Sequence, residues 1–515
     1  MNKYLTTTLF LLSLSHLKAA TFEATTQTLP VLNDGEPTVV MRFNFKTQKP
    51  RVLTGIKINT SGTTDLADLK EIAVFMDRRA GDLAMGASKP NKGIVNLTQS
   101  TKIPPGNHTC KLVVQTKKGA DLLHRIGLQI TEFTFADGDH LKVPQAENFS
   151  PSRLAYTIHK RGQHNSHTFR IPAIARANNG DLLAVYDMRY NSRKDLQEHM
   201  DIGLSVSKDG GQTWADPVPI MDMGEYGGKP QKENGCSDPG ILVDSKTGEI
   251  FVTACWTHGK PGTHQWSGKG SEPGHSIHKA TQFMVVRSNN HGKTWSKPEN
   301  WTEKLKDPSW YLFAPAPGNG ITMKNGTLVM PTQGRDAKGR PFSNITWSKD
   351  HGKTWHVSSH ARDNTTECAV AELSDGSLML NMRDNRNRKD KSDTNGRAVS
   401  TTTNLGKTWS KHSADHSALP EPVCMASLIS FKHPRGKHVL LFSNPNNKKG
   451  RSKMTIQMSL DDGKTWPEKY HVLLDSKGGA YSSLVLIDEK TIGTLYESSA
   501  ADMIFQKISL DNLAR

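Results

Sequence analysis

Histidines and cysteines are the residues of this 515-residue chain that would most readily bind zinc or act as thiol nucleophiles. Four histidines gather in one segment, namely His258, His264, His275 and His278. Their spacing matches no zinc motif, so we interpret the segment as a polar loop. The five cysteines are Cys110, Cys236, Cys255, Cys368 and Cys424. They form no Cys-x-x-Cys pair, and their odd number leaves at least one thiol free. We therefore expect neither a metal site nor a disulfide framework.

A short pattern, Ser/Thr-x-Asp/Asn-x-Gly-x-Thr-Trp, occurs five times. Its copies are Ser207–Trp214, Ser288–Trp295, Ser348–Trp355, Thr402–Trp409 and Ser459–Trp466. The pattern is typical of a tight turn, in which the Asp/Asn oxygen accepts a backbone N–H two residues on and glycine allows a positive φ. The tryptophans are 81, 60, 54 and 57 positions apart. Such a period predicts a repeated unit of about four strands, as in a β-propeller.

The chain divides into a part without this pattern and a part with it. Residues 21–148 alternate apolar and polar residues in short runs, which predicts an antiparallel β-sandwich. Residues 149–515, divided by six, give about 61 residues per unit, close to the tryptophan spacing. The first interval is lengthened by an insertion between Gly224 and Lys279. We expect two closing strands in 481–497, and overall an all-β chain with a small β-sandwich before a six-bladed β-propeller.

Residues 1–20 have the pattern of a secretory signal peptide. Lys3 precedes an apolar run from Leu5 to Leu14, and Ala19-Ala20 follows as a small-residue cleavage site. The run is too short to span a bilayer, and an uncleaved anchor is the alternative. We therefore predict a secreted or periplasmic protein.

The chain is strongly basic, with a formal net charge of +16 and a mean hydropathy of −0.57. Its lysines and arginines are dispersed and form no long basic tract. This distribution argues against a nucleic-acid partner. It fits an acidic glycan, or simply a solvated basic surface.

One further motif, Phe169-Arg170-Ile171-Pro172, precedes the five repeats. Together they resemble the exo-sialidase (neuraminidase) superfamily over about residues 150–515. The preceding segment resembles the sandwich domain of some bacterial sialidases. The resemblance implies a retaining exo-α-sialidase that removes terminal sialic acid from glycoproteins, glycolipids or oligosaccharides. It implies no cofactor and no membrane span, and we expect a monomer.

The resemblance implies three arginines that bind the carboxylate of the substrate. Arg170 matches the first, Arg383 the second and Arg451 the third, with Arg435 as an alternative to Arg451. A guanidinium is a fixed planar fork of donors that always stays charged, which suits a carboxylate. Glu497 matches the glutamate that braces the first arginine.

The resemblance also implies a catalytic tyrosine, a carboxylate beside it and an acid/base. Tyr481, Glu367 and Asp195 match these in turn. The anomeric carbon of sialic acid bears a carboxylate, which would repel an anionic nucleophile. A neutral phenol can approach it and then lose its proton to a neighbouring base. The alternatives are Glu372 for the partner of tyrosine, and Asp187 or Asp201 for the acid/base.

Further residues match the rest of the pocket. Arg189 matches a pocket arginine, and Asp238 resembles the carboxylate near the 4-hydroxyl of the sugar. We expect Gln333 to face the glycerol chain, and Trp256 or Trp266 to contact the N-acetyl methyl group. The five tryptophans of the repeats are expected to pack within their blades.

Two other functions fit the same resemblance. A non-catalytic propeller that binds sialylated glycans would keep the arginines but lose the tyrosine, glutamate or aspartate, and all three are present here. A trans-sialidase, or an enzyme that releases an anhydro product, would keep all of these residues. The sequence does not separate those outcomes from hydrolysis.

Overall fold

The computed structural model describes residues 20–25, 27–91, 93–145, 149–260, 270–393 and 395–513. Strands dominate it, and the described residues contain one α-helix, α1 (Thr302–Leu305). The described 3-10 helices are η1 (Leu66–Asp68), η2 (Gln163–Asn165), η3 (Gln231–Glu233), η4 (Asn385–Arg388), η5 (Glu468–Tyr470) and η6 (Leu510–Asn512). None of these helices has the length and apolar character needed to cross a membrane. The all-β prediction is confirmed.

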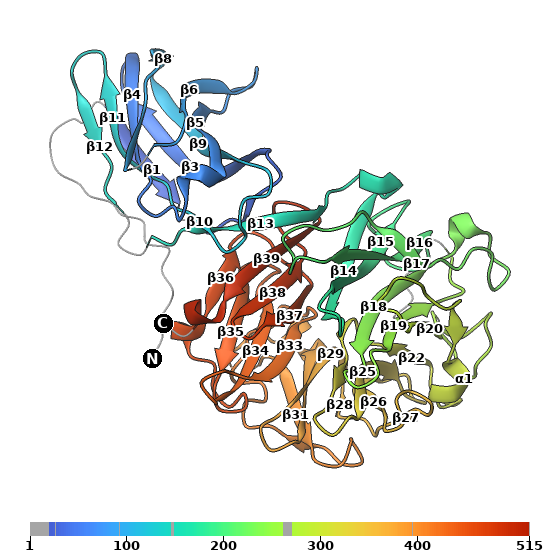
Figure 1. The fold of residues 1–515 in the computed structure, drawn as a ribbon. Coiled ribbons are helices and arrows are strands. Elements are labelled where there is room, and N and C mark those ends of the chain that lie inside the picture. The colour runs from blue at the N-terminus through green and yellow to red at the C-terminus, as the bar shows by residue number, and fades with distance from the viewer. Residues whose placement is uncertain are drawn as a thin grey trace.

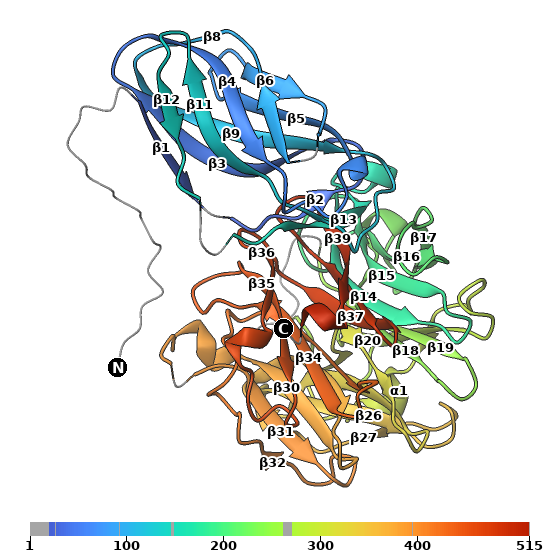
Figure 2. The same ribbon diagram turned by 60° about the vertical axis from the view of Figure 1, so that its left-hand side comes forward.

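The first part of the chain forms two sheets in a lobe of their own (Figures 1 and 2). One sheet has the order β1-β3-β9-β5-β6: β1 (Ala20–Thr25), β3 (Pro37–Thr47), β9 (Gly106–Thr116), β5 (Leu69–Met76) and β6 (Leu83–Ser88). The other contains β12 (His140–Lys142), β11 (Gln129–Phe135), β4 (Arg51–Asn59), β7 (Ile94–Leu97) and β8 (Thr101–Ile103). Buried aromatic rings join the two sheets, since the centroids of Phe45 and Phe133 are 5.0 Å apart.

The second part forms consecutive small sheets arranged around a common centre (Figure 1). The first has β14 (Thr168–Arg176), β15 (Leu182–Arg189), β16 (Met200–Ser207) and β17 (Val218–Met221). The next has β18 (Cys236–Val243), β19 (Ile250–Trp256), β20 (Gln282–Ser288), β21 (Glu299–Asn300) and β23 (Gly318–Asn319). It is followed by the sheet of β22 (Leu312–Pro315), β24 (Ile321–Thr322), β25 (Leu328–Arg335), β26 (Pro341–Ser348), β27 (His356–Val357) and β28 (Arg362–Asp363).

Three more sheets complete this part. One has β29 (Thr365–Glu372), β30 (Leu378–Asp384), β31 (Ala398–Thr402) and β32 (Ser410–Lys411). Another has β33 (Ser427–Lys432), β34 (His438–Pro445), β35 (Met454–Ser459) and β36 (Val472–Asp475). The last has β37 (Ser482–Asp488), β38 (Thr491–Tyr496) and β39 (Met503–Ser509), with β13 (Ser152–His159), β10 (Arg125–Ile126) and β2 (Val31–Leu32). The two closing strands expected in 481–497 are β37 and β38.

The last sheet joins the beginning of the second part of the chain to its last strand. β13 pairs antiparallel with β39, with Tyr156 opposite Phe505. β2 and β10, which come from the first 148 residues, also pair with β13. The division predicted at residue 148 is therefore less sharp than the sequence pattern suggests, because the first part of the chain contributes two short strands to the last sheet.

The five repeats form turns of one geometry. In the first, the Ser207 hydroxyl accepts the N–H of Gly211 at 2.8 Å, and Asp209 Oδ1 accepts the N–H of Thr213 at 2.9 Å. The aspartate thus reaches an N–H four residues on, instead of the two that we expected. The reason is the backbone, because Gly210 and Gly211 have φ values of 67° and 89° and fold the loop back.

The tryptophans of the repeats pack against the core clusters, as expected, although only Trp466 is buried and the other four are half-buried. Trp214 donates its indole N–H to the carbonyl of Gly211 at 3.1 Å and lies 5.1 Å from the ring of Phe505 in β39. A Cβ on Gly211 would lie 2.1 Å from that phenylalanine ring. The turn therefore requires glycine both for its positive φ and for the close approach of the last sheet.

Candidate active site

Arg170 leaves the regular pairing of β14 at an irregular point of the strand. The register against β15 shifts between Arg170 and Ala173, Ile171 has a φ of 59°, and Pro172 has no N–H to donate. Glu497 fits this irregularity, since its two oxygens accept hydrogen bonds from Arg170 Nε and Nη2, both at 3.2 Å. Its Oε1 also accepts the N–H of Ile171 at 3.0 Å. The Phe-Arg-Ile-Pro motif and Glu497 thus fix one guanidinium in place.

Tyr481, Glu367 and Arg383 form a hydrogen-bonded group. The Tyr481 hydroxyl donates to Glu367 Oε1. Glu367 Oε2 accepts a hydrogen bond from Arg383 Nη1 at 2.5 Å, and that nitrogen is also 3.2 Å from the tyrosine oxygen. Burial raises the pKa of Tyr481 well above its usual value; the charge of Glu367 adds to the rise and that of Arg383 opposes it. The phenol is therefore neutral in the resting protein.

Three arginines surround this tyrosine. Arg170 and Arg451 lie over its ring, with guanidinium carbons 5.4 and 5.5 Å from the ring centroid. Arg383 approaches its hydroxyl. Arg451 is oriented by a 3.2 Å hydrogen bond from Nη2 to the carbonyl of Val423. We call Arg170, Arg383 and Arg451 the arginine triad, and its three planar donor groups suit an anion held beside the tyrosine.

Two of the alternatives from the sequence lie outside this group. Arg435 is mostly exposed and is 3.6 Å from Asp511. Glu372, at the far end of β29 from Glu367, accepts the N–H of Lys324 at 2.9 Å. Neither contacts the tyrosine, so the geometry favours Arg451 and Glu367 for the predicted roles.

The side chain of Asp195 is partly exposed and also lies close to one arginine of the triad. Its side chain is 43% exposed, and Oδ1 lies 3.7 Å from Arg170 Nη1. The two alternatives are buried. Asp187 is fully enclosed, and Asp201 accepts a hydrogen bond from the Tyr190 hydroxyl at 2.7 Å, while burial raises the pKa of Asp201 to about 7. A proton donor to a substrate must be accessible, so the geometry favours Asp195.

Arg189 supports Asp195 from behind. It is fully buried, and its Nη1 donates to Asp195 Oδ1 at 2.9 Å and to the carbonyls of Arg193 and Lys194 at 2.8 Å each. Its other donors reach Asp187 Oδ2, at 3.1 and 2.7 Å. Direct contact of Arg189 with a substrate stays a prediction. In the structure, Arg189 fixes the shape of the loop that carries Asp195.

Asp238 lies in a bulge of β18, where the register shifts between Ser237 and Gly240 and the aspartate has a φ of 61°. Its own N–H donates to Asp187 Oδ1 at 3.1 Å. Burial raises the pKa of Asp238 well above its usual value, and the charges of Asp187, Glu367 and Asp195 add to the rise. Asp238 is therefore a carboxyl group near Asp187, Glu367 and Asp195 that favours its neutral form, in which it can donate a hydrogen bond.

The remaining pocket predictions fare differently. Gln333 is buried in β25 and donates to the carbonyl of Pro315 at 3.2 Å, so its role toward a substrate stays a prediction. The prediction for Trp256 is wrong, because its ring is fully buried in the core and donates to Asn234 Oδ1 at 2.5 Å. Trp266 lies outside the described residues.

The histidine segment holds no metal site among the residues that the structure describes. The rings of His258 and His278 pack edge to face, 5.1 Å apart. His264 lies outside the described residues.

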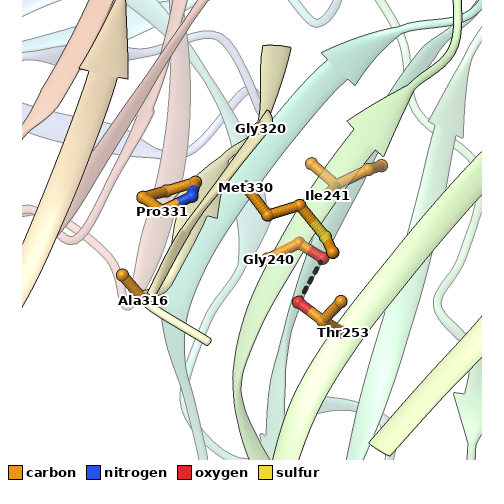
Figure 3. Close-up of a pocket in the computed structure, with 7 residues that line it drawn as sticks. All are labelled: Gly240, Ile241, Thr253, Ala316, Gly320, Met330 and Pro331. Atoms are coloured by element: carbon orange, nitrogen blue, oxygen red, sulfur yellow. Dashed lines mark hydrogen bonds between the residues drawn. The ribbon is translucent and has the colours of Figure 1, made fainter. Parts of the chain in front are cut away.

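A small pocket lies close to β18 but is chemically different from the site (Figure 3). Its walls are Gly240, Ile241, Thr253, Ala316, Gly320, Met330 and Pro331. Thr253 is the one polar side chain among them, and its hydroxyl donates to the Gly240 carbonyl at 3.4 Å. With no titratable group in its walls, this pocket cannot perform acid–base chemistry.

A buried ion pair that sequence reasoning missed supports the site. Arg397, just before β31, donates from Nη1 to Glu421 Oε2 and to the carbonyl of Cys424, both at 2.7 Å. Its Nε and Nη2 donate to the side chain and carbonyl of Asn381, at 2.7 and 3.2 Å. The side chains of Arg397 and Glu421 are 1% and 0% exposed. The sequence signal was slight: a charged residue at the start of a buried strand.

The pair of Arg397 and Glu421 contacts the segments that hold Arg383, Arg451 and Tyr481 in place. Asn381 precedes Arg383 by two positions on β30. Segment 421–425 holds Arg451 through the carbonyl of Val423, and the thiol of Cys424 donates to the carbonyl of Ala480, next to Tyr481, at 3.2 Å. Displacing Arg397 would therefore disturb two members of the arginine triad and the tyrosine together.

Comparisons with known proteins find a matching domain family, similar sequences and a similar solved structure. Residues 180–495 match the sequence model of a BNR repeat-like domain. The chain is 45% identical to a sialidase of Bacteroides fragilis (strain YCH46), over 83% of this chain and 78% of that protein. It is 32% identical to a sialidase of Micromonospora viridifaciens, over 65% of this chain and 50% of that one. The solved structure of the Hadza microbial sialidase Hz136 superposes with a TM-score of 0.88 and 37% identity, over 95% of this chain and 100% of that chain.

Proposed function

The chain belongs to the sialidase family and is an exo-sialidase acting on sialylated glycans, and we propose that it cleaves them with retention through a covalent intermediate on Tyr481. The observation that carries the proposal is the hydrogen bond from the Tyr481 hydroxyl to Glu367, in a buried place flanked by the arginine triad. A neutral phenol beside a base can approach an anomeric carbon that bears a carboxylate.

The proposed reaction has two steps. First, Glu367 takes the phenolic proton while the Tyr481 oxygen bonds to the anomeric carbon, and Asp195 gives a proton to the departing glycosidic oxygen. Second, Asp195 takes a proton from water, whose oxygen displaces the tyrosine, and the phenolate recovers its proton from Glu367. Asp195 thus acts as acid and then as base, as in other retaining glycosidases. The arginine triad binds the carboxylate throughout, and the neutral Asp238 is suited to donate to a sugar hydroxyl.

Proton NMR of the first product tests this proposal against its alternatives. Retention releases the α-anomer of sialic acid before mutarotation. A trans-sialidase would instead move sialic acid to an added sugar acceptor, and intramolecular transfer would release an anhydro sugar. Release of the β-anomer first would contradict the tyrosyl intermediate, because a single displacement inverts the configuration.

We also propose an architecture and a location. The six consecutive sheets of residues 149–515 are assigned as six blades of one propeller, each of four main strands. The two sheets of residues 21–148 are assigned as a β-sandwich, on the basis of their aromatic contacts. Residues 1–20 are assigned as a signal peptide, so the mature enzyme would be secreted or periplasmic. We also propose that it acts as a monomer.

Arg170→Lys is expected to lower kcat/KM by about tenfold to a hundredfold, although the charge is kept. A lysine cannot present the fork that meets both oxygens of Glu497 and a substrate carboxylate. Initial rates with an aryl sialoside measure the loss. Unchanged kcat and KM would show that Arg170 does not bind the carboxylate.

Arg397→Lys is expected to lower kcat/KM by about tenfold and to lower Tm as well. A lysine can reach Glu421 but leaves the acceptors on Asn381 and Cys424 without their donors. Arg362→Lys is the matched control, because Arg362 also pairs with a carboxylate, Asp415, at 2.8 Å. Asp415 accepts the N–H of Val399 on β31, the strand that directly follows Arg397.

The two variants separate positioning from plain stability. Rates are measured well below either Tm, with KM and kcat determined separately. A positioning role predicts that Arg397→Lys changes both constants while Arg362→Lys lowers only Tm. If both variants lower Tm and keep wild-type kinetics, the pair of Arg397 and Glu421 serves stability alone.

A further inference from the structure

Beside Arg451, two loops carry an excess of positive charge. Segments 386–393 and 448–453 contain eight lysines and arginines but two aspartates. Lys448 joins the loops, since its Nζ lies 3.3 Å from Asp393 Oδ1. We call the surface of these two segments the basic rim. Its charge is too large to be neutralised by its own carboxylates.

Several cations of the basic rim are available to a ligand. Among them, Arg388, Lys389 and Lys449 are exposed. Within the described parts of the chain, none of the three forms an ion pair with a carboxylate. Arg388 makes one long hydrogen bond, 3.4 Å from Nε to Asn385 Oδ1. Exposed and unpaired cations gathered in one place form a surface that fits an anion.

The basic rim borders the arginine triad. Arg388 is the last residue of the 3-10 helix η4, which directly follows the strand that carries Arg383. Lys449 precedes Arg451 by two positions. Partial burial lowers the pKa of Arg388, and the like charges of Arg383 and Arg451 add to the fall. The positive charge of Arg388 is therefore felt by two members of the triad, Arg383 and Arg451.

The chemistry of sialic acid connects this rim to the rest of the substrate. Its carboxylate and its glycosidic oxygen are bonded to the same anomeric carbon. If the triad holds the carboxylate, as the proposed function requires, the aglycone leaves the pocket next to the triad. The basic rim borders Arg383 and Arg451, so an aglycone that leaves the pocket beside these two arginines passes it.

We propose that the basic rim binds a second anionic group on the aglycone. The group would be the carboxylate of a neighbouring sialic acid or a sulfate ester on the adjoining sugar. Arg388 and Lys449 are the residues best placed to pair with it. Exposed ion pairs are individually weak, so the rim gives a preference for polyanionic sialylated glycans and leaves neutral aglycones as substrates.

The test compares wild type with the double variant Arg388→Gln/Lys449→Gln. The substrates are sialyllactose, disialyllactose and sialyllactose with a sulfate on galactose. At low salt, the double variant is expected to lose about threefold to tenfold in kcat/KM on the anionic aglycones and almost nothing on sialyllactose. Added salt should shrink this difference, because exposed charges are screened. Comparing variant with wild type on each substrate removes the effect of linkage.

The matched control is Arg435→Gln/Lys437→Gln, which removes two exposed charges from another turn of the same part of the chain. It is expected to affect all three substrates equally. A loss on sulfated substrate alone identifies sulfate as the ligand, and a loss on disialyllactose alone identifies the carboxylate. Equal losses on neutral and anionic substrates, or none, overturn the proposal. Failure of wild type to release any sialic acid would instead refute the proposed function.

Discussion

Tyr481→Phe is expected to abolish turnover, with kcat falling by several powers of ten, while the protein stays folded. The substitution removes the oxygen that attacks the anomeric carbon and keeps the ring. That ring packs in a small apolar cluster with Ile171, Cys424 and Met425, so its shape must be preserved. The measurement is the initial rate on an aryl sialoside, with Tm determined in parallel.

Tyr186→Phe is the matched control for this variant. Tyr186 is fully buried and its hydroxyl hydrogen-bonds to Ser205 at 2.7 Å, on the face of β15 opposite to Asp187 and Arg189. It should lose some stability and keep its activity. Near-normal hydrolysis by Tyr481→Phe would refute the nucleophile assignment, whereas equal inactivation of both variants would point to a folding defect.

Asp195→Ala is expected to lose about 10²- to 10⁴-fold in kcat/KM on sialyllactose, and at least tenfold less on a good aryl sialoside. A sugar leaves as an alkoxide and needs the proton of an acid. A stabilised phenolate leaves without one. The comparison uses kcat/KM because that constant reports the step that breaks the glycosidic bond.

The dependence on the leaving group is the decisive part of this prediction. Equal losses on both substrates would assign Asp195 a binding role. The acid would then have to be sought at Asp201 or Asp187, although Asp187 is fully buried against Arg189. Asp201→Asn serves as the comparison, since Asp201 is buried behind Tyr190 and should show no dependence on the leaving group.

Local chemistry made the turns and strands predictable. The repeats have the residues that their geometry needs, with a side-chain acceptor at Asp209 and a glycine at Gly211 in the first copy. The predicted hydrogen-bond donor to Asp209 is wrong by two residues. The positive φ values of Gly210 and Gly211 fold the loop back, so that the N–H of Thr213 lies next to the aspartate. A sequence pattern names the turn but does not show how far its loop folds back.

The site was partly predictable for a different reason. Arg170, Glu367 and Tyr481 could be found from the short motifs around them, and the structure brings them together. Short motifs do not show which acceptors the N–H groups of a side chain will reach. Arg189 occurs in a promising segment, yet its donors reach Asp187 and the loop of Asp195.

Residues that act through packing gave almost no sequence signal. Arg397 and Glu421 are 24 positions apart, and each is of a type that is usually solvated. Only the packing of two neighbouring sheets brings them into one buried pair. The prediction for Trp256 was wrong for a related reason. Both faces of β19 are buried, so Trp256 belongs to the core although it precedes a long loop.

The joining of β13 to β39 in one sheet has a consequence for biosynthesis. Arg170 lies on β14, the first strand of the first sheet in the second part of the chain. Tyr481 directly precedes β37 and Glu497 directly follows β38, both strands of the last sheet. Glu497 follows Arg170 by 327 positions. β39 must also pair with β13 before the last sheet is complete. A chain synthesised only as far as β36 therefore lacks Tyr481 and the partner of Arg170. The arrangement of Arg170, Glu497 and Tyr481 can therefore form only after the strands of the last sheet have been synthesised and have paired.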